Sequence, residues 1–182
     1  MKGPEICRFG VLTASDRASQ GEYVDESGPA IEDFLEKCLT SPFVITRKLV
    51  PDIQDEIESS LIDLIDRDNC DVIITTGGTG PSLRDVTPEA TENICDKILP
   101  GFGEQMRNIS LKYVPTAILS RQMAGIRGKC LIINLPGSPR SIREILDIIF
   151  TSVPYCVDLL GGPYITTNPK IIQTFRPSKK NK

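Results

Sequence analysis

The chain has 182 residues, 40% of them hydrophobic and 25% charged, which fits one domain with a sizeable core rather than a disordered segment. Its net charge of −3 argues against a nucleic-acid-binding protein, because such proteins carry a basic excess over a whole face. Since no apolar run approaches the ~18 residues of a membrane span and the N-terminus lacks the apolar stretch of a secretory signal, we expect a cytoplasmic protein that binds neither membrane nor nucleic acid.

The first half of the chain alternates between predicted strands and helices. Arg8–Thr13 is a short apolar run that predicts a strand. Apolar residues at helical spacing follow over positions 31–39, and Ser27 is a candidate N-cap for that helix. Phe43–Val50 is rich in β-branched residues and predicts a second strand, after which a second helix is expected to begin at Asp52.

The second half continues the alternation. Val72–Thr76 is apolar throughout and predicts a strand that is buried on both faces, and Lys129–Leu135 repeats this pattern. Thr87-Pro88 is expected to start the helix PEATENICDKIL, with the proline as its first residue. A turn is expected at Pro100-Gly101. Further helices are expected at Phe102–Tyr113, after Ser138-Pro139, and at Val153–Leu160.

This order of elements predicts an α/β fold: a single three-layer domain whose mostly parallel sheet has helices on both faces. We expect residues 1–165 to form the domain and residues 166–182 to form a C-terminal extension with a basic tail. Ligands of such sheets bind beyond the carboxyl ends of the strands, so the functional site is expected there. The polar segments that meet at this edge are Ser15-Asp16, Asp52, Thr76–Gly80 and Asn134–Ser138.

The segment DVIITTGGTGPSLRDVTP ends a predicted strand in Thr76–Gly80. Glycine lets the backbone adopt positive φ and lets a ligand approach it closely, so successive N–H groups can converge on an anion. The loop therefore predicts a phosphate or carboxylate cradle, although a tight turn without a ligand explains the same residues. It matches neither a Walker A loop nor a dinucleotide fingerprint, because Gly80 is followed by Pro81-Ser82.

Two carboxylates, Asp52 and Asp85, are expected beside this loop. Each has a simpler interpretation, Asp52 as a helix N-cap and Asp85 as the local partner of Arg84. Placed together beside an anion cradle, they suit a shared Mg²⁺, with a nearby guanidinium offsetting phosphate charge. Ser138 is similarly explained as the cap of a helix that starts at Pro139.

Histidine is absent, and the six cysteines are scattered without a C-x-x-C spacing. This pattern is inconsistent with a zinc site and predicts buried, reduced thiols. The lack of histidine also removes the Ser-His and Cys-His mechanisms, so acid–base work would fall to carboxylates, lysine or water.

A series of short motifs occurs in one order: T-x-S-D-R, D-x-S-G-P, V-P-D, T-T-G-G-T-G, R-D-V-T-P-E, L-S-R, G-I-R-G-K and N-L-P-G-S-P. This ordered set resembles the molybdopterin adenylyltransferase family, which includes bacterial MogA and the G domain of gephyrin. The resemblance extends from about Arg8 to Pro163. It implies adenylylation of molybdopterin by ATP with release of pyrophosphate, which prepares the pterin for molybdate insertion by a partner protein.

The resemblance also implies Mg²⁺ as cofactor, ATP and molybdopterin as substrates, and a homotrimer. Asp52 and Asp85 would be the catalytic and metal-binding residues. The substrate- and phosphate-binding residues would be Thr76, Gly77, Gly78, Thr79, Gly80, Ser15, Asp16, Ser120, Asn134, Pro136, Gly137 and Ser138. Candidate counter-charges for phosphate are Arg17, Arg84, Arg121 and Lys129.

Other functions are compatible with parts of this pattern. A carrier that binds a pterin or nucleotide without chemistry would need the glycine loop but not the two acids, so the presence of both acids favours an enzyme. A scaffold role normally relies on a long linker and a second domain, and the sequence indicates neither. A related branch with a different role in pterin metabolism stays open.

Overall fold

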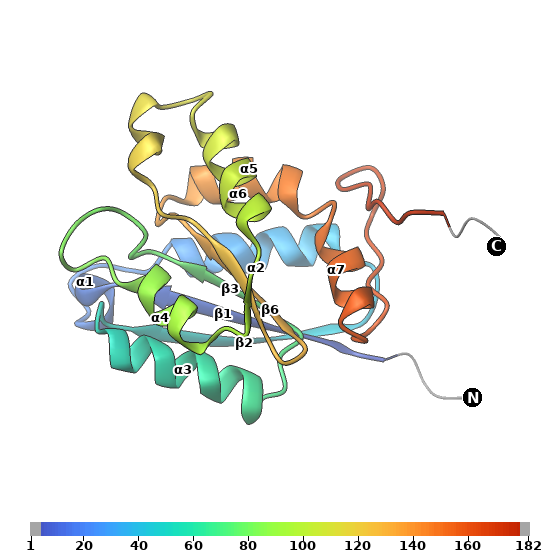
Figure 1. The fold of residues 1–182 in the computed structure, drawn as a ribbon, viewed down its shortest axis with the longest axis horizontal. Coiled ribbons are helices and arrows are strands. Elements are labelled where there is room, and N and C mark those ends of the chain that lie inside the picture. The colour runs from blue at the N-terminus through green and yellow to red at the C-terminus, as the bar shows by residue number, and fades with distance from the viewer. Residues whose placement is uncertain (1–4, 179–182) are drawn as a thin grey trace.

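Two layers of helices enclose a six-stranded sheet in the computed structural model, which describes residues 5–178 (Figure 1). The strands lie in the order β2-β1-β3-β6-β5-β4. Four of them, β1, β2, β3 and β6, run parallel, which confirms the predicted α/β architecture. Their bounds are β1 Cys7–Ala14, β2 Phe43–Val50, β3 Val72–Thr76, β4 Lys97–Ile98, β5 Ala124–Arg127 and β6 Cys130–Leu135.

The helices form the two outer layers. They are α1 Asp16–Ser19, α2 Ser27–Cys38, α3 Gln54–Asp66, α4 Thr87–Ile94, α5 Pro100–Ser110, α6 Pro139–Ile149 and α7 Val153–Leu159, with a short 3-10 helix η1 at Pro115–Leu119. The first core packs α2, α5, α6 and α7 on one face of the sheet, and the second packs α3 and α4 on the other (Figure 1). Because strand side chains alternate, Val72 and Ile74 enter the first core and Ile73 enters the second.

The strand order reverses at β1, since β2 pairs with one edge of β1 and β3 with the other. In open α/β sheets a ligand crevice forms at such a point, outside the carboxyl ends of the strands. The ends of β1 and β3 touch here: a carbon added to Gly77 would lie 2.2 Å from the Ala14 carbonyl oxygen. The fold therefore brings the predicted site segments to this crevice.

Strands β4 and β5 were not predicted, and both are antiparallel to their neighbours. A two-residue turn, Gly128-Lys129, joins β5 to β6, and Gly128 takes the positive φ of 57° that such turns require. The prediction that a helix covers PEATENICDKIL is wrong at its end. It stops at Ile94 because Cys95 is extended (φ −81°, ψ 140°), and β4 pairs with β5 instead.

Three predicted helix starts are also wrong. Helix α3 begins at Gln54, and the carboxylate of Asp52 does not cap it. Ser27 is the first residue of α2 rather than its cap, because the carboxylate of Asp25 accepts the first free N–H groups of that helix. Helix α5 starts at Pro100, within the predicted turn, and ends at Ser110 rather than at Tyr113.

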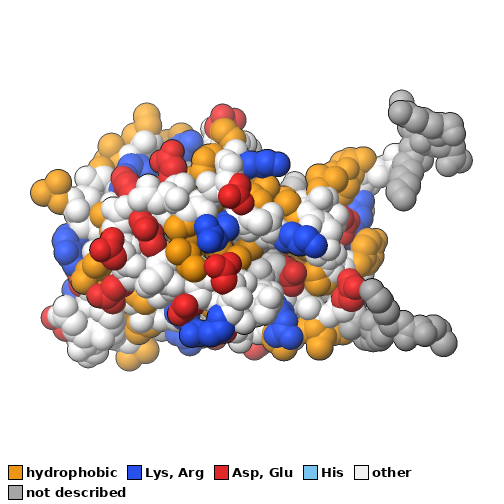
Figure 2. Space-filling view, turned by 60° about the horizontal axis from the view of Figure 1, so that its bottom comes forward, with side chains coloured by type: hydrophobic (Ala, Val, Ile, Leu, Met, Phe, Trp, Pro, Cys, Tyr) orange, Lys and Arg blue, Asp and Glu red, His pale blue; other side chains and the backbone are white. Residues whose placement is uncertain are grey.

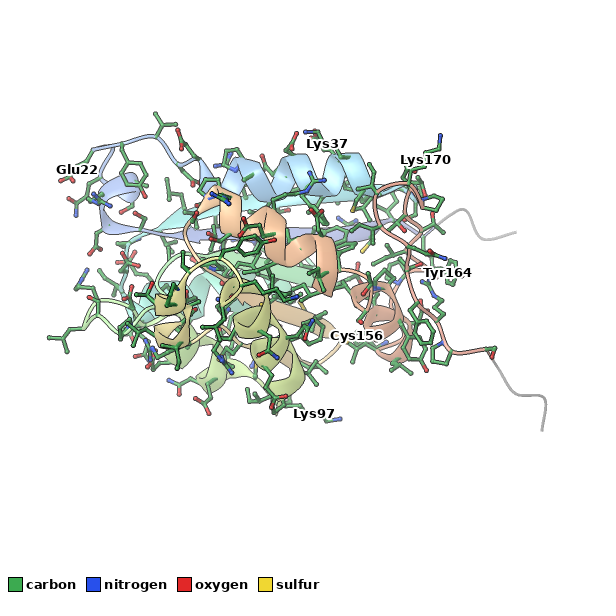
Figure 3. The ribbon with its side chains drawn as sticks, turned by 90° about the horizontal axis from the view of Figure 1, so that it is seen from above. Glu22, Lys37, Lys97, Cys156, Tyr164 and Lys170 are labelled. Carbon is green, nitrogen blue, oxygen red and sulfur yellow. The ribbon has the colours of Figure 1, made fainter. Side chains whose placement is uncertain are left out.

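Residues 166–178, the described part of the predicted C-terminal extension, are held against the rest of the chain. Ile172 is buried in the first core, and Arg176 donates to the carboxylate of Asp158 at the end of α7. Tyr164 and Lys170 lie at the end of the molecule opposite Glu22, which follows α1 (Figure 3). The extension is therefore distant from the crevice. Residues 179–182 of the predicted basic tail lie outside the described residues.

All six cysteines are free. Four of them are buried as predicted, and burial raises the pKa of the Cys38 thiol to about 12. Acidic and basic side chains are interspersed over the face that carries α3 (Figure 2). Between residues 5 and 178, no helix is long and apolar enough to cross a membrane.

Candidate functional site

Asp16 and Asp52, at the ends of β1 and β2, are held together through main-chain contacts. The Asp16 N–H donates to Asp52 Oδ2 over 2.9 Å, and the Asp52 N–H donates to Asp16 Oδ1 over 3.0 Å. Arg84 reaches across from the loop after β3 and donates to both carboxylate oxygens of Asp16 at 2.6 to 2.9 Å. The interpretation of Asp85 as the partner of Arg84 is therefore wrong, and Asp85 instead accepts from the Ser82 N–H.

The neighbouring carboxylates have different electrostatic surroundings. The hydrogen bonds from Arg84 hold the pKa of Asp16 below its usual value. Burial raises the pKa of Asp52, and the nearby charges of Asp16 and Asp85 act in the same direction. No ion pair within residues 5–178 involves Asp52 or Asp85. A cation beside Asp52 would reduce the cost of keeping that carboxylate ionised.

The carbonyl groups of the glycine loop, Gly77–Gly80, all point into the protein. The hydroxyl and the N–H of Thr87 donate to the first two carbonyls, at 3.0 and 3.1 Å. The N–H and the Nε of Arg121 donate to the last two, at 2.8 and 2.9 Å. Within the described chain, the N–H groups of the last three loop residues have no protein acceptor. Free N–H groups of successive residues are what an anion-binding nest requires.

Glycine is needed in this loop for backbone and steric reasons. Gly77 and Gly78 have φ values of 91° and 62°, which side-chain-bearing residues rarely adopt. A carbon added to Gly78 would lie 2.3 Å from the Thr87 hydroxyl oxygen. One added to Gly80 would lie 2.9 Å from Asp85 Oδ2, so the loop and this carboxylate are in close proximity.

Two cavities flank the glycine loop. The first, of about 360 Å³, is lined by Asp16, Asp52 and Asp85 among other residues. The second, of about 420 Å³, is lined by residues of η1 and by Ser120. Their common walls are formed by Gly77, Gly78, Asp85 and Gly137. A further cavity of about 530 Å³, between α5 and α6, has no ionisable side chain in its lining and so offers little to an anionic substrate.

Most predicted site residues line one or both of the first two cavities. They are Ser15, Asp16, Asp52, Gly77, Gly78, Thr79, Gly80, Asp85, Ser120, Pro136 and Gly137.

Three predicted substrate-binding residues do not line these cavities. Thr76 and Asn134 are fully buried beneath the loops. The Thr76 hydroxyl donates to the Pro136 carbonyl at 2.9 Å, and the Asn134 amide donates to buried threonine hydroxyls of β3 and α4 at 3.0 Å. Thr76 thus supports the loop after β6 from below, and Asn134 ties β6 to β3 and α4. Ser138 is exposed at the N-cap position of α6, where its side chain makes no capping hydrogen bond.

The candidate counter-charges are dispersed. Arg17 lines the first cavity, whereas Arg84 is paired with Asp16. The Arg121 side chain donates to protein groups. Lys129 precedes β6 and lies at the opposite edge of the sheet, beside Asp71, so its prediction as a phosphate contact is wrong.

Sequence reasoning missed some residues at the crevice. Tyr23 and Ser27 line the first cavity, and Asp25 holds its wall by accepting hydrogen bonds from Thr13 and Arg47. Burial alone would raise the pKa of Asp25, but its hydrogen bonds outweigh burial and hold the pKa below its usual value. The available signal was the D-x-S-G-P motif, which contains both Asp25 and Ser27.

Known proteins share this sequence and fold. Residues 10–155 match a family described as a probable molybdopterin binding domain. A molybdopterin adenylyltransferase of Helicobacter pylori strain 26695 is 61% identical over 175 residues, covering 96% of this chain and 99% of that protein. The molybdopterin adenylyltransferase of Escherichia coli K12 is 51% identical over 182 residues, covering 93% of each.

The agreement extends to three dimensions. The crystal structure of the molybdopterin biosynthesis enzyme MoaB from Thermus thermophilus superimposes with a TM-score of 0.79 at 42% identity, covering 87% of this chain and 99% of that one. The sequence identity and the shared fold both confirm the resemblance inferred from the motifs. The chain therefore belongs to the molybdopterin adenylyltransferase family.

Proposed function

We propose that the protein adenylylates molybdopterin: the terminal phosphate of the pterin attacks the α-phosphorus of ATP, and pyrophosphate leaves. The adenylylated product then goes to molybdate insertion. The observation that carries this proposal lies at one edge of the sheet: among the described residues, a set of free loop N–H groups lies beside two carboxylates without ion pairs. The close relatives named molybdopterin adenylyltransferase support the same reaction.

The geometry suits a reaction between two anionic substrates. The free N–H groups of Gly78, Thr79 and Gly80 would bind the terminal phosphate of the pterin at the boundary between the two cavities. The cavity with the carboxylates would hold the ATP phosphates, and the cavity beside η1 would hold the pterin. Catalysis of such a transfer depends on positioning and electrostatics. Because the attacking phosphate is already ionised near pH 7, no histidine is required.

The carboxylates fit a magnesium ion that is bound together with substrate. Mg²⁺ is usually held by one or two carboxylates plus substrate phosphates and waters. Asp52 and Asp85 provide such a pair, and no metal-binding cluster of three or more side chains exists within residues 5–178. ATP oxygens would therefore complete the coordination. The bound ion would disperse charge on the leaving pyrophosphate.

The cellular setting follows from the substrates and the family. A cytoplasmic location fits the use of ATP and the six free cysteines, since thiols stay reduced there. Membership of the family supports a homotrimer and a molybdate-insertion protein as the recipient of the product.

An adenylylation assay tests this function. Purified protein would be incubated with ATP and molybdopterin, with MgCl₂ or with excess EDTA, and pyrophosphate and adenylylated pterin would be quantified. We expect the two products in equal amounts with Mg²⁺, none with EDTA, and none when pterin is omitted. Binding of the pterin without adenylylation under any divalent ion would instead identify a carrier.

A further inference from the structure

The guanidinium of Arg121 joins both ends of the loop that follows β3. Its Nε donates to the Gly80 carbonyl over 2.9 Å, and its Nη2 donates to the Asp85 carbonyl over 2.5 Å. Nη1 donates to the carboxylate of Glu89 in α4. One planar group thus connects the end of the glycine loop, the residue that carries the second carboxylate, and the following helix.

The same residue also holds the loop through its main chain. The Arg121 N–H donates to the Thr79 carbonyl over 2.8 Å. Arg121 therefore fixes the carbonyls of Thr79 and Gly80. The Gly80 N–H, which lies between these two carbonyls, is turned to the opposite side of the loop. Since the peptide unit is planar, a carbonyl that is turned inward leaves the N–H of the next residue turned outward.

The loop between these contacts has little other support. Residues 81–84 are exposed, with Leu83 99% accessible to solvent. The Asp85 N–H donates to the Ser82 carbonyl, and the Ser82 N–H donates to the Asp85 carboxylate. These two bonds stabilise the turn but do not anchor it to the rest of the protein. The other side-chain link from this segment is Arg84 to Asp16, across the first cavity. Arg121 anchors the loop on the side that faces away from the first cavity.

We propose that Arg121 is a positioning residue, whose guanidinium sets the place of the Gly80 carbonyl at the end of the glycine loop and the place of Asp85, without itself binding a substrate phosphate. This inference deepens the proposed adenylylation and rests on it. Lysine should not replace Arg121, because a single ammonium cannot reproduce the planar fork that reaches three acceptors in different directions.

Kinetics of three variants test the proposal. We expect Arg121→Ala and Arg121→Lys each to lower kcat about 100-fold, because small misplacement of reacting groups has effects of that size. Arg67→Ala, which removes an exposed arginine at the end of α3, is the matched control and should keep the wild-type kcat. Added guanidinium ion, at concentrations well below those that unfold the protein, should restore about 10-fold of the activity of Arg121→Ala. It should not restore Arg121→Lys, whose side chain fills the space.

Hydrogen exchange of the substrate-free protein provides a readout that does not require turnover. In Arg121→Ala, the hydrogen-bonded amides of Ser82, Asp85 and Thr87 should exchange at least about 10-fold faster, while those of β3 and β6 keep their wild-type rates. Wild-type kcat and exchange in Arg121→Lys would overturn the proposal, as would faster exchange throughout the sheet without guanidinium rescue. If the wild-type protein shows no turnover, the adenylylation proposal fails, and the exchange comparison still decides whether Arg121 anchors the loop.

Discussion

Asp85→Asn is expected to lower kcat by about 100- to 1000-fold, the range seen when one electrostatic contact to a transition state is removed. Asp85 contacts both cavities, lies near Gly80 and has no ion pair within residues 5–178, so its charge is available to a metal ion. Asparagine keeps the shape and can still accept from the Ser82 N–H, as Asp85 does. The affinity for molybdopterin should therefore change by less than about 3-fold.

The measurement is a steady-state assay at saturating MgATP and molybdopterin, with pterin affinity titrated separately in the absence of ATP. Asp147→Asn is the control, because Asp147 is a half-exposed carboxylate on α6 that pairs with Arg143. It should retain wild-type values of both quantities. Equal losses of affinity and turnover in Asp85→Asn would show that Asp85 shapes the cavity rather than recruiting the metal.

Gly78→Ala is expected to weaken molybdopterin binding about 10- to 100-fold, the loss of one to two charge-assisted hydrogen bonds. The added carbon would lie 2.3 Å from the hydroxyl oxygen of Thr87, a fully buried residue that cannot easily move aside. Displacing it would break the hydrogen bond from Thr87 to the Gly77 carbonyl, which helps to orient the loop. The free energy of unfolding should fall by about 3 kcal/mol, from the left-handed backbone together with the steric conflict.

Gly128→Ala is the control that separates the loss of pterin affinity from the loss of stability. Gly128 has a φ of 57°, close to the 62° of Gly78, but a carbon added to it meets no atom of residues 5–178 within 4 Å. It should lose about 1 kcal/mol of stability in urea unfolding and bind pterin like the wild type. If Gly78→Ala matches Gly128→Ala in both stability and affinity, the loop does not form an anion cradle.

The parallel strands could be predicted because β1, β3 and β6 are local apolar runs and β2 is rich in β-branched residues, and β2 and β3 have the predicted bounds. The location of the site followed from chain topology, since Ser15, Asp52 and Gly77 all come directly after or close to strand ends. Strands β4 and β5 are different. They have two and four residues, and they are defined by pairing, β5 with β6 and β4 with β5, rather than by any pattern of their own.

Individual roles were harder to predict than the location of the site. Thr76 and Asn134 belong to the same loop motifs as the residues that line the cavities, yet both are fully buried. A motif does not reveal which of its polar side chains points inward. The role of Arg121 depends on acceptors 32 to 41 residues earlier in the chain, and such contacts leave no local signal in the sequence.

A crystal structure with molybdopterin and a non-hydrolysable ATP analogue bound in the presence of Mg²⁺ tests the central claim most directly. We predict the terminal phosphate of the pterin within hydrogen-bonding distance of the N–H groups of Gly78, Thr79 and Gly80, and a magnesium ion on Asp52, Asp85 or both. Either ligand seated at the opposite edge of the sheet, beside Lys129 and Asp71, would contradict it.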